Sequence, residues 1–110
     1  MDGLLALNEL NELTARLGTA VNMLQKYGKD YALAERNYKV ALSEQALRLR
    51  AQDMPVTLID KVIHGKVANE RFNRDTAEVL YKTAQENINA IKLQIRILDA
   101  QIAREWGRNE

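Results

Sequence analysis

The sequence predicts an all-α fold: a long antiparallel helical hairpin of coiled-coil type with a short connector helix, in a single domain spanning residues 1–110. Apolar residues return at intervals of three and four along two stretches of about 40 residues, as one face of an α-helix requires. Residues that favour helix fill most positions, whereas only 5% are aromatic and there is one proline, Pro55. The chain is long enough for one domain and too short for two.

The first long helix is expected at about residues 4–50. Polar residues fall between its apolar positions, so one side is buried and the other solvated. Gly18 and Gly28 each weaken the helix by about 1 kcal/mol relative to alanine, and their lack of a side chain permits a close crossing by a second helix. The apolar stripe consists of Leu10, Leu13, Leu17, Ala20, Val21, Leu24, Tyr27, Tyr31, Ala34, Tyr38, Ala41, Leu42 and Leu49.

The segment around Pro55 is expected to end this helix, because proline lacks an amide donor and restricts the residue before it. The sequence Thr57-Leu58-Ile59-Asp60 is typical of a capping box, in which the Thr hydroxyl and an acidic side chain satisfy free amides at a helix start. A short helix is therefore predicted at about residues 58–64. Gly65 can adopt the left-handed conformation, so it is expected to terminate this helix.

The third helix, expected at about residues 67–106, carries the most regular pattern. Apolar residues alternate at intervals of four and three, which is typical of a coiled coil. These residues are Ala77, Tyr81, Ala84, Ile88, Ile91, Ile95, Leu98 and Ile102.

A second apolar stripe lies on another side of the third helix. One partner helix cannot cover both stripes, so we expect a homo-oligomer that forms a helical bundle; burial by a different protein is the alternative. Trp106 either closes the bundle end against the start of the first helix or anchors an interface. The predicted oligomer interface consists of Ala90, Leu93, Ile97, Ala100 and Trp106.

The composition excludes several kinds of site. With no cysteine and one histidine, disulfide scaffolds, thiol catalysis and zinc sites that need Cys or several His are ruled out. The sequence has no Gly-rich phosphate loop, Ser-His-Asp set or metal motif, so we predict a non-enzymatic protein with no catalytic residue, metal site or cofactor.

No hydrophobic stretch reaches the roughly 20 residues that a membrane helix needs. We therefore expect a cytoplasmic protein with no membrane contact.

The connector has a local excess of positive charge, although the net charge of the chain is only +1. If its basic side chains point outward, this end would bind phosphate groups, nucleic acid or an acidic partner. The alternative is that they only solvate a connector. The predicted anionic-target site, whose basic residues we expect away from the heptad seam, consists of Lys61, His64, Lys66, Arg71 and Arg74.

Three tyrosines, Tyr27, Tyr31 and Tyr38, share the apolar face of the first helix. They could stack on nucleic-acid bases. Tyrosines at this spacing more often line the edge of a core with their hydroxyls reaching water, and we expect Tyr81 to be their packing partner.

Four segments together resemble small uncharacterised helical-hairpin proteins encoded by prophages of Gram-positive bacteria. The resemblance implies a phage accessory protein inside the host cell. Our leading hypothesis is that it binds a protein or nucleoprotein target, for example to inhibit a host defence system in the manner of an anti-CRISPR protein. The alternative is a nucleic-acid-binding accessory factor of phage DNA replication or recombination. The segments are Leu7-Asn8-Glu9-Leu10, residues 31–38, Met54-Pro55-Val56-Thr57 and residues 102–107.

Overall fold

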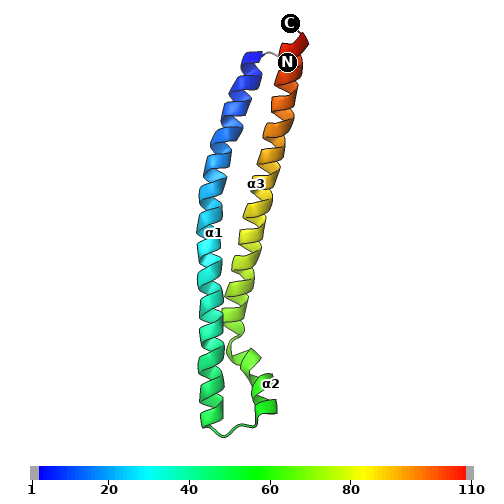
Figure 1. Cartoon of the computed structure of the whole chain (residues 1–110). Coiled ribbons are helices and arrows are strands. Elements are labelled where there is room, and N and C mark those ends of the chain that lie inside the picture. The colour runs from blue at the N-terminus through cyan, green and yellow to red at the C-terminus, as the bar shows by residue number, and fades with distance from the viewer. Residues whose placement is uncertain (1–2, 109–110) are drawn as a thin grey trace. The chain divides into compact units, whose positions relative to one another are not determined.

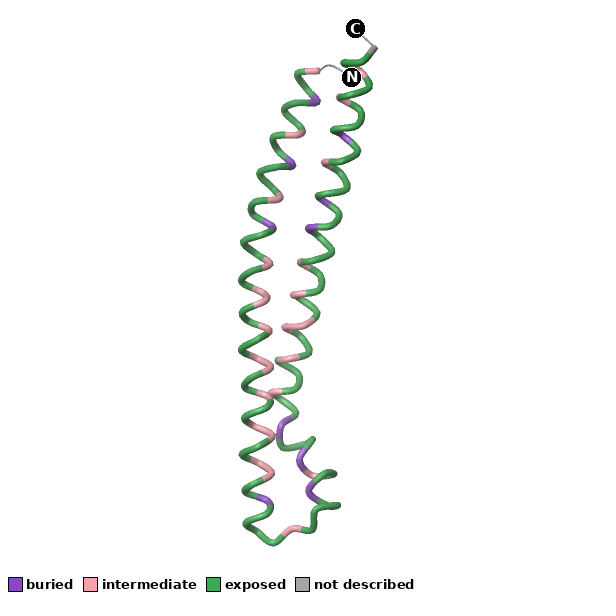
Figure 2. Tube along the Cα trace, in the orientation of Figure 1, coloured by how far each residue is buried: buried purple, intermediate pink, exposed green. Residues whose placement is uncertain are grey.

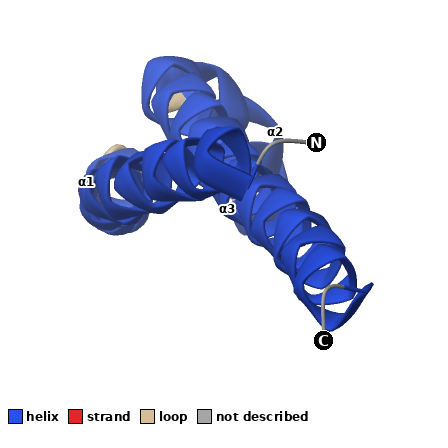
Figure 3. Cartoon of the chain, turned by 90° about the horizontal axis from the view of Figure 1, so that it is seen from above, coloured by secondary structure: helices blue, strands red, loops and turns tan. Residues whose placement is uncertain are grey.

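The computed structural model describes residues 3–108, which form three helices: α1 (Gly3–Ala51), α2 (Val56–Lys66) and α3 (Ala68–Arg108) (Figure 1). These residues contain no strand (Figure 3). Unit 1 takes the described residues up to Lys26 and from Lys82 onward, and unit 2 is Tyr27–Tyr81. In each unit a segment of α1 lies beside an oppositely directed segment of α3. The predicted all-α hairpin with a short connector helix is therefore confirmed.

The core of unit 1 is a narrow seam between α1 and α3 (Figure 2). On α1 the buried residues Ala6, Leu13 and Ala20 recur every seven positions. Leu13 packs in one cluster with Ala6 and Leu98 of α3, and Ala20 packs in a second with Ile88 and Ile91. Because the buried positions follow the heptad period, each helix gives only one stripe to the core. Half-buried Leu10, Leu17, Leu24, Ile95 and Ile102 flank these clusters.

In unit 2 the connector helix packs on the last turns of α1. Ile59 and Ile63, four residues apart on one face of α2, form a buried cluster with Leu49. Leu42, Ala46, Met54 and Val62 pack around this cluster.

The end of α1 is a Schellman motif. Asp53 adopts the left-handed conformation, with φ of 58°. Its amide donates to the carbonyl of Arg50 at 3.0 Å, and the amide of Met54 donates to the carbonyl of Leu49 at 3.2 Å. Met54 also packs against Leu49, which is the hydrophobic contact that accompanies this motif. The predicted end of the first helix before Pro55 is thus confirmed, and backbone carbonyls that α1 would leave without partners are satisfied.

The predicted capping box at Thr57 is wrong. Pro55 is the N-cap of α2, no side chain caps the helix, and Thr57 lies inside it. The carbonyl of Pro55 accepts the amides of Leu58 and Ile59 at 3.0 Å each. The helix therefore begins at Val56, directly after the proline and two residues before the predicted start. The Thr57 hydroxyl thus lies beyond the capping position.

The predicted termination at Gly65 is also wrong, because Gly65 is a residue of α2 and has no positive φ. α2 runs to Lys66, and a single residue, Val67, separates it from α3. Val67 has φ of −111° and ψ of 19° and is fully buried, at 0% exposure. Its amide donates to Ile63 and its carbonyl accepts from Arg71. A buried side chain, not a flexible glycine, therefore sets the break between the helices.

The predicted packing of Tyr81 is confirmed for Tyr31, whose ring lies 6.0 Å from that of Tyr81 at 36°. A Cβ atom placed on Gly28 would lie 3.1 Å from Cε1 of Tyr81, so the close crossing predicted there is confirmed. The same expectation for Gly18 is wrong, since nothing lies within 4 Å of a Cβ placed there.

Candidate functional site

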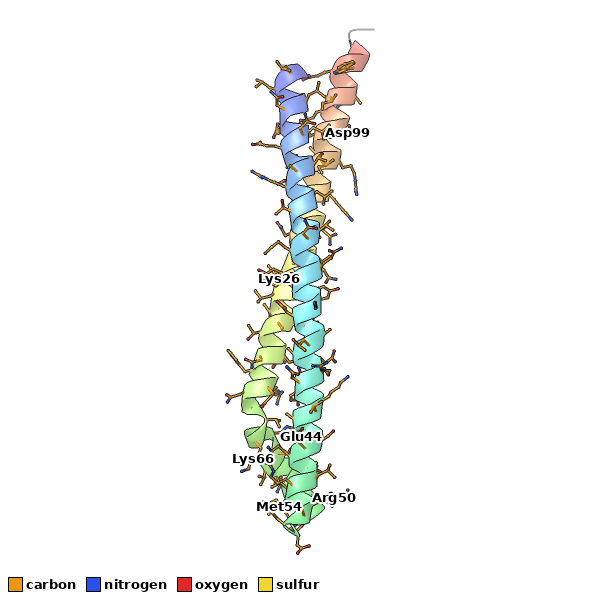
Figure 4. The ribbon with its side chains drawn as sticks, turned by 90° about the vertical axis from the view of Figure 1, so that its left-hand side faces the viewer. Lys26, Glu44, Arg50, Met54, Lys66 and Asp99 are labelled. Atoms are coloured by element: carbon orange, nitrogen blue, oxygen red, sulfur yellow. The ribbon has the colours of Figure 1, made fainter. Side chains whose placement is uncertain are left out.

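Three members of the predicted anionic-target site lie on α2, and Lys61 and His64 lie on the side away from the buried Ile59 and Ile63. Lys61, His64 and Lys66 are exposed, and Lys66 projects from the α2 end of unit 2 (Figure 4). Within residues 3–108 neither Lys61 nor Lys66 takes part in an ion pair. Lys61 and His64 share one side of the helix, whereas Lys66 lies two residues beyond His64 and hence on another side.

The remaining two members, Arg71 and Arg74, are held by Asp75. Arg74 donates to the Asp75 carboxylate from Nη2 at 2.8 Å and from Nε at 3.1 Å. Nε of Arg71 lies 4.0 Å from the other carboxylate oxygen. The hydrogen bond that Arg74 donates to the Asp75 carboxylate raises the pKa of Arg74 above its ordinary value, an effect that burial opposes. Asp75 therefore reduces the positive charge that this end offers to an anionic ligand.

The expectation that Arg74 lies away from the heptad seam is wrong. Its guanidinium carbon is 4.4 Å from the ring centroid of Tyr38 on α1, in cation–π geometry. The side chain is 26% exposed, against 54% for Arg71. The signal was present in the sequence: intervals of four and three lead back from Tyr81 through Ala77 to Arg74. The five predicted residues thus do not form one surface.

The predicted oligomer interface also divides between two sides of α3. Leu93 and Ile97 are each 52% exposed, and Ala90 and Ala100 are exposed beside them. Trp106 is 60% exposed, so it does not close the end of unit 1 against α1. It lies nine residues beyond Ile97, which is two and a half turns at about 3.6 residues per turn. Trp106 therefore faces away from Ile97.

Sequence reasoning missed a groove between α1 and α3 in unit 1. Two adjoining hollows of about 360 and 620 Å³ share Glu12, Arg16 and Gln94 as lining residues. The buried seam residues Leu13, Ala20, Ile91 and Leu98 contribute to the lining of this groove. Its walls are polar apart from Ala15, Ala90 and Ile97, so a search for apolar periodicity does not find it. The remaining lining residues are Glu9, Thr19, Asn87 and Gln101.

A comparison with protein-family profiles, curated proteins and solved structures found no significant match to this chain. The resemblance to prophage-encoded proteins therefore stays a prediction. No group of three or more His, Asp or Glu residues in the described part of the chain could hold a metal ion. Over the same residues, none of the three helices combines the length and apolarity needed to cross a membrane.

Proposed function

We propose that this chain acts by binding rather than by catalysis: it assembles with a second copy and presents the remaining surface of α3 to a protein or nucleoprotein target. The observation that supports this is the exposure of Leu93 and Ile97 on a helix whose opposite stripe already packs in the seam. Full burial of such a side chain is worth about 1.5–3 kcal/mol, so covering two half-exposed ones gives a partner a useful share of its binding energy.

The resemblance to prophage-encoded proteins suggests the setting, the cytoplasm of a bacterial host. A small helical protein that binds one host factor would suit an accessory role such as the inhibition of a defence nuclease. Leu93 and Ala100, which lie one heptad or about two helical turns apart on α3, are uncharged and exposed, and we assign the target contact to them.

Nucleic-acid binding through the connector is the second candidate. Lys61, His64 and Lys66 are exposed, which favours it. Asp75 forms ion pairs with Arg71 and Arg74, which weakens the case for nucleic-acid binding. Phosphate contacts depend on the number of available basic groups, and of the five predicted residues this leaves two lysines and one histidine to hold a nucleic acid.

Capture of partners from a Gram-positive bacterium that expresses a tagged chain separates these two candidates. We expect a partner that survives nuclease treatment, is lost with Leu93→Glu and is retained when Lys61, His64 and Lys66 are all changed to Ser. Each change affects exposed residues, which usually alters stability by no more than about 0.5 kcal/mol. A partner that disappears with nuclease or with the triple change would refute the protein-binding proposal in favour of nucleic acid.

A further inference from the structure

The α1 and α3 walls of the unit 1 groove can be aligned by the core layer that they share. Leu13 of α1 and Leu98 of α3 pack in the same buried cluster, so these residues mark one layer of the hairpin. Glu12 and Arg16 lie one turn apart on the α1 wall, on either side of this layer. On the α3 wall Ile97 lies at the same layer, with Gln94 and Gln101 one turn away in each direction.

Glu12 and Arg16 make the α1 wall complementary in charge to a second copy of the same wall. When two such walls meet in antiparallel orientation, with the midpoint between Glu12 and Arg16 at the centre, each Glu12 faces the Arg16 of the other wall. In the same register Leu5 faces Met23, because each is nine residues from that midpoint. Both are exposed, and the helical repeat puts them on the groove side of α1.

We propose that the unit 1 groove receives the same groove of a second copy, related by a twofold axis that crosses the helices at Ile97, with Glu12 of each copy paired to Arg16 of the other. This dimer rests on the self-association in the proposed function, and it specifies which surface forms the interface and which symmetry relates the two copies. An isologous interface must be self-complementary, and this wall meets that requirement at Glu12 with Arg16 and at Leu5 with Met23. Glu9, which also lines the wall, faces Thr19 in this register.

The arrangement also orients α3. Ile97 lies on the axis and faces its own copy, while Gln94 of each chain lies opposite Gln101 of the other. The two amide side chains are uncharged and can each donate and accept, so they can hydrogen-bond to one another. Leu93, as exposed as Ile97, does not line the groove.

A charge-swap series tests the pairing by sedimentation on the purified full chain. In Glu12→Arg two arginines face each other across the axis, and in Arg16→Glu two glutamates do, so each variant alone should dimerise about tenfold more weakly. An equimolar mixture of the two should form heterodimers at wild-type strength, because every facing pair is then opposite in charge. High salt should reduce these differences. Circular dichroism checks that each variant keeps its helix content.

Failure of the mixture to recover dimer would overturn the pairing. So would a wild-type chain that is monomeric at high micromolar concentration, which would leave the groove to a different protein. These measurements need no target. A negative result here therefore refutes the dimer, whereas a negative capture experiment with intact dimers refutes the proposed target binding.

Single cysteines provide a matched check, because the natural chain has none. On mild oxidation Ile97→Cys should give a disulfide-linked dimer, since the two sulfur atoms meet at the axis and a disulfide needs Cα atoms within about 7 Å. Leu93→Cys changes a residue of the same exposure on the same helix. This variant should run largely as a monomer on a non-reducing denaturing gel. Equal cross-linking of the two variants, or stronger cross-linking at residue 93, would show that the groove is not the dimer interface.

Discussion

Two glycines within α1 should respond differently to the same substitution. Gly18 and Gly28 are both helical, so replacing either with alanine removes the entropic cost of glycine in a helix, about 1 kcal/mol. At Gly18 nothing lies within 4 Å of the new Cβ atom, so Gly18→Ala should gain this amount in full. For a domain of this size the gain raises Tm by about 4 °C.

At Gly28 the new Cβ atom would lie 3.1 Å from Cε1 of Tyr81, closer than the usual contact between carbon atoms of about 3.5–4.0 Å. The Tyr81 ring must move by a few tenths of an ångström, and it is half-buried against Tyr31. We therefore expect the cost of displacing the ring to cancel most of the gain, leaving Gly28→Ala within about 0.5 kcal/mol of wild type.

Thermal and guanidinium unfolding at one fixed protein concentration measure both changes, since self-association makes Tm depend on concentration. Introducing Gly28→Ala in a Tyr81→Ala background provides the control, because without the ring the substitution should recover the full gain. Equal stabilisation by Gly18→Ala and Gly28→Ala in the wild-type background would refute the close contact between Gly28 and Tyr81.

Three further changes test the helix ends and the seam. Asp53→Gly should raise the free energy of unfolding by about 0.5 kcal/mol in guanidinium titrations, because Asp53 holds a left-handed φ that glycine adopts without steric cost; a decrease would contradict the Schellman geometry. Thr57→Ala should change stability by less than about 0.5 kcal/mol, since Thr57 caps no amide, whereas a loss near 1 kcal/mol would restore the capping box. Arg74→Gln should lower Tm more than Arg71→Gln, because both arginines contact Asp75 but only Arg74 stacks on Tyr38; equal effects would show that the stacking contributes nothing.

The extent of the three helices was predictable because it depends on local periodicity. The predicted ends of the long helices, at residues 4, 50, 67 and 106, differ from the observed ones by one or two residues. The junctions were less predictable, since several local patterns compete there. Thr57 and Gly65 carry familiar end signals, yet the carbonyl of Pro55 and the buried Val67 determine where α2 begins and ends. These depend on backbone geometry and packing that no short sequence motif contains.

The candidate binding surfaces required the tertiary structure for a related reason. Glu12 and Arg16 are indistinguishable in sequence from ordinary solvated residues, and only the layer shared by Leu13 and Leu98 brings them level with Ile97. Arg74 was assigned to a ligand site on the basis of its charge alone. Its position in the four-three pattern of the third helix, which places it at the seam, was not considered.

A heptad seam does not by itself fix which layers meet, because sliding one helix by seven residues preserves the apolar pattern. In unit 2 the irregular positions supply the missing information. A slip of one heptad would move Tyr81 from Gly28 to Val21 or Glu35, whose side chains leave no room for the ring at that distance. The same slip would take Arg74 from Tyr38 to Tyr31 or Gln45. Because Tyr31 also offers an aromatic face, the cation–π contact tolerates one of these slips, whereas the glycine contact tolerates neither. Gly28 therefore specifies the register of α1 against α3 in unit 2 more strictly than Arg74 does.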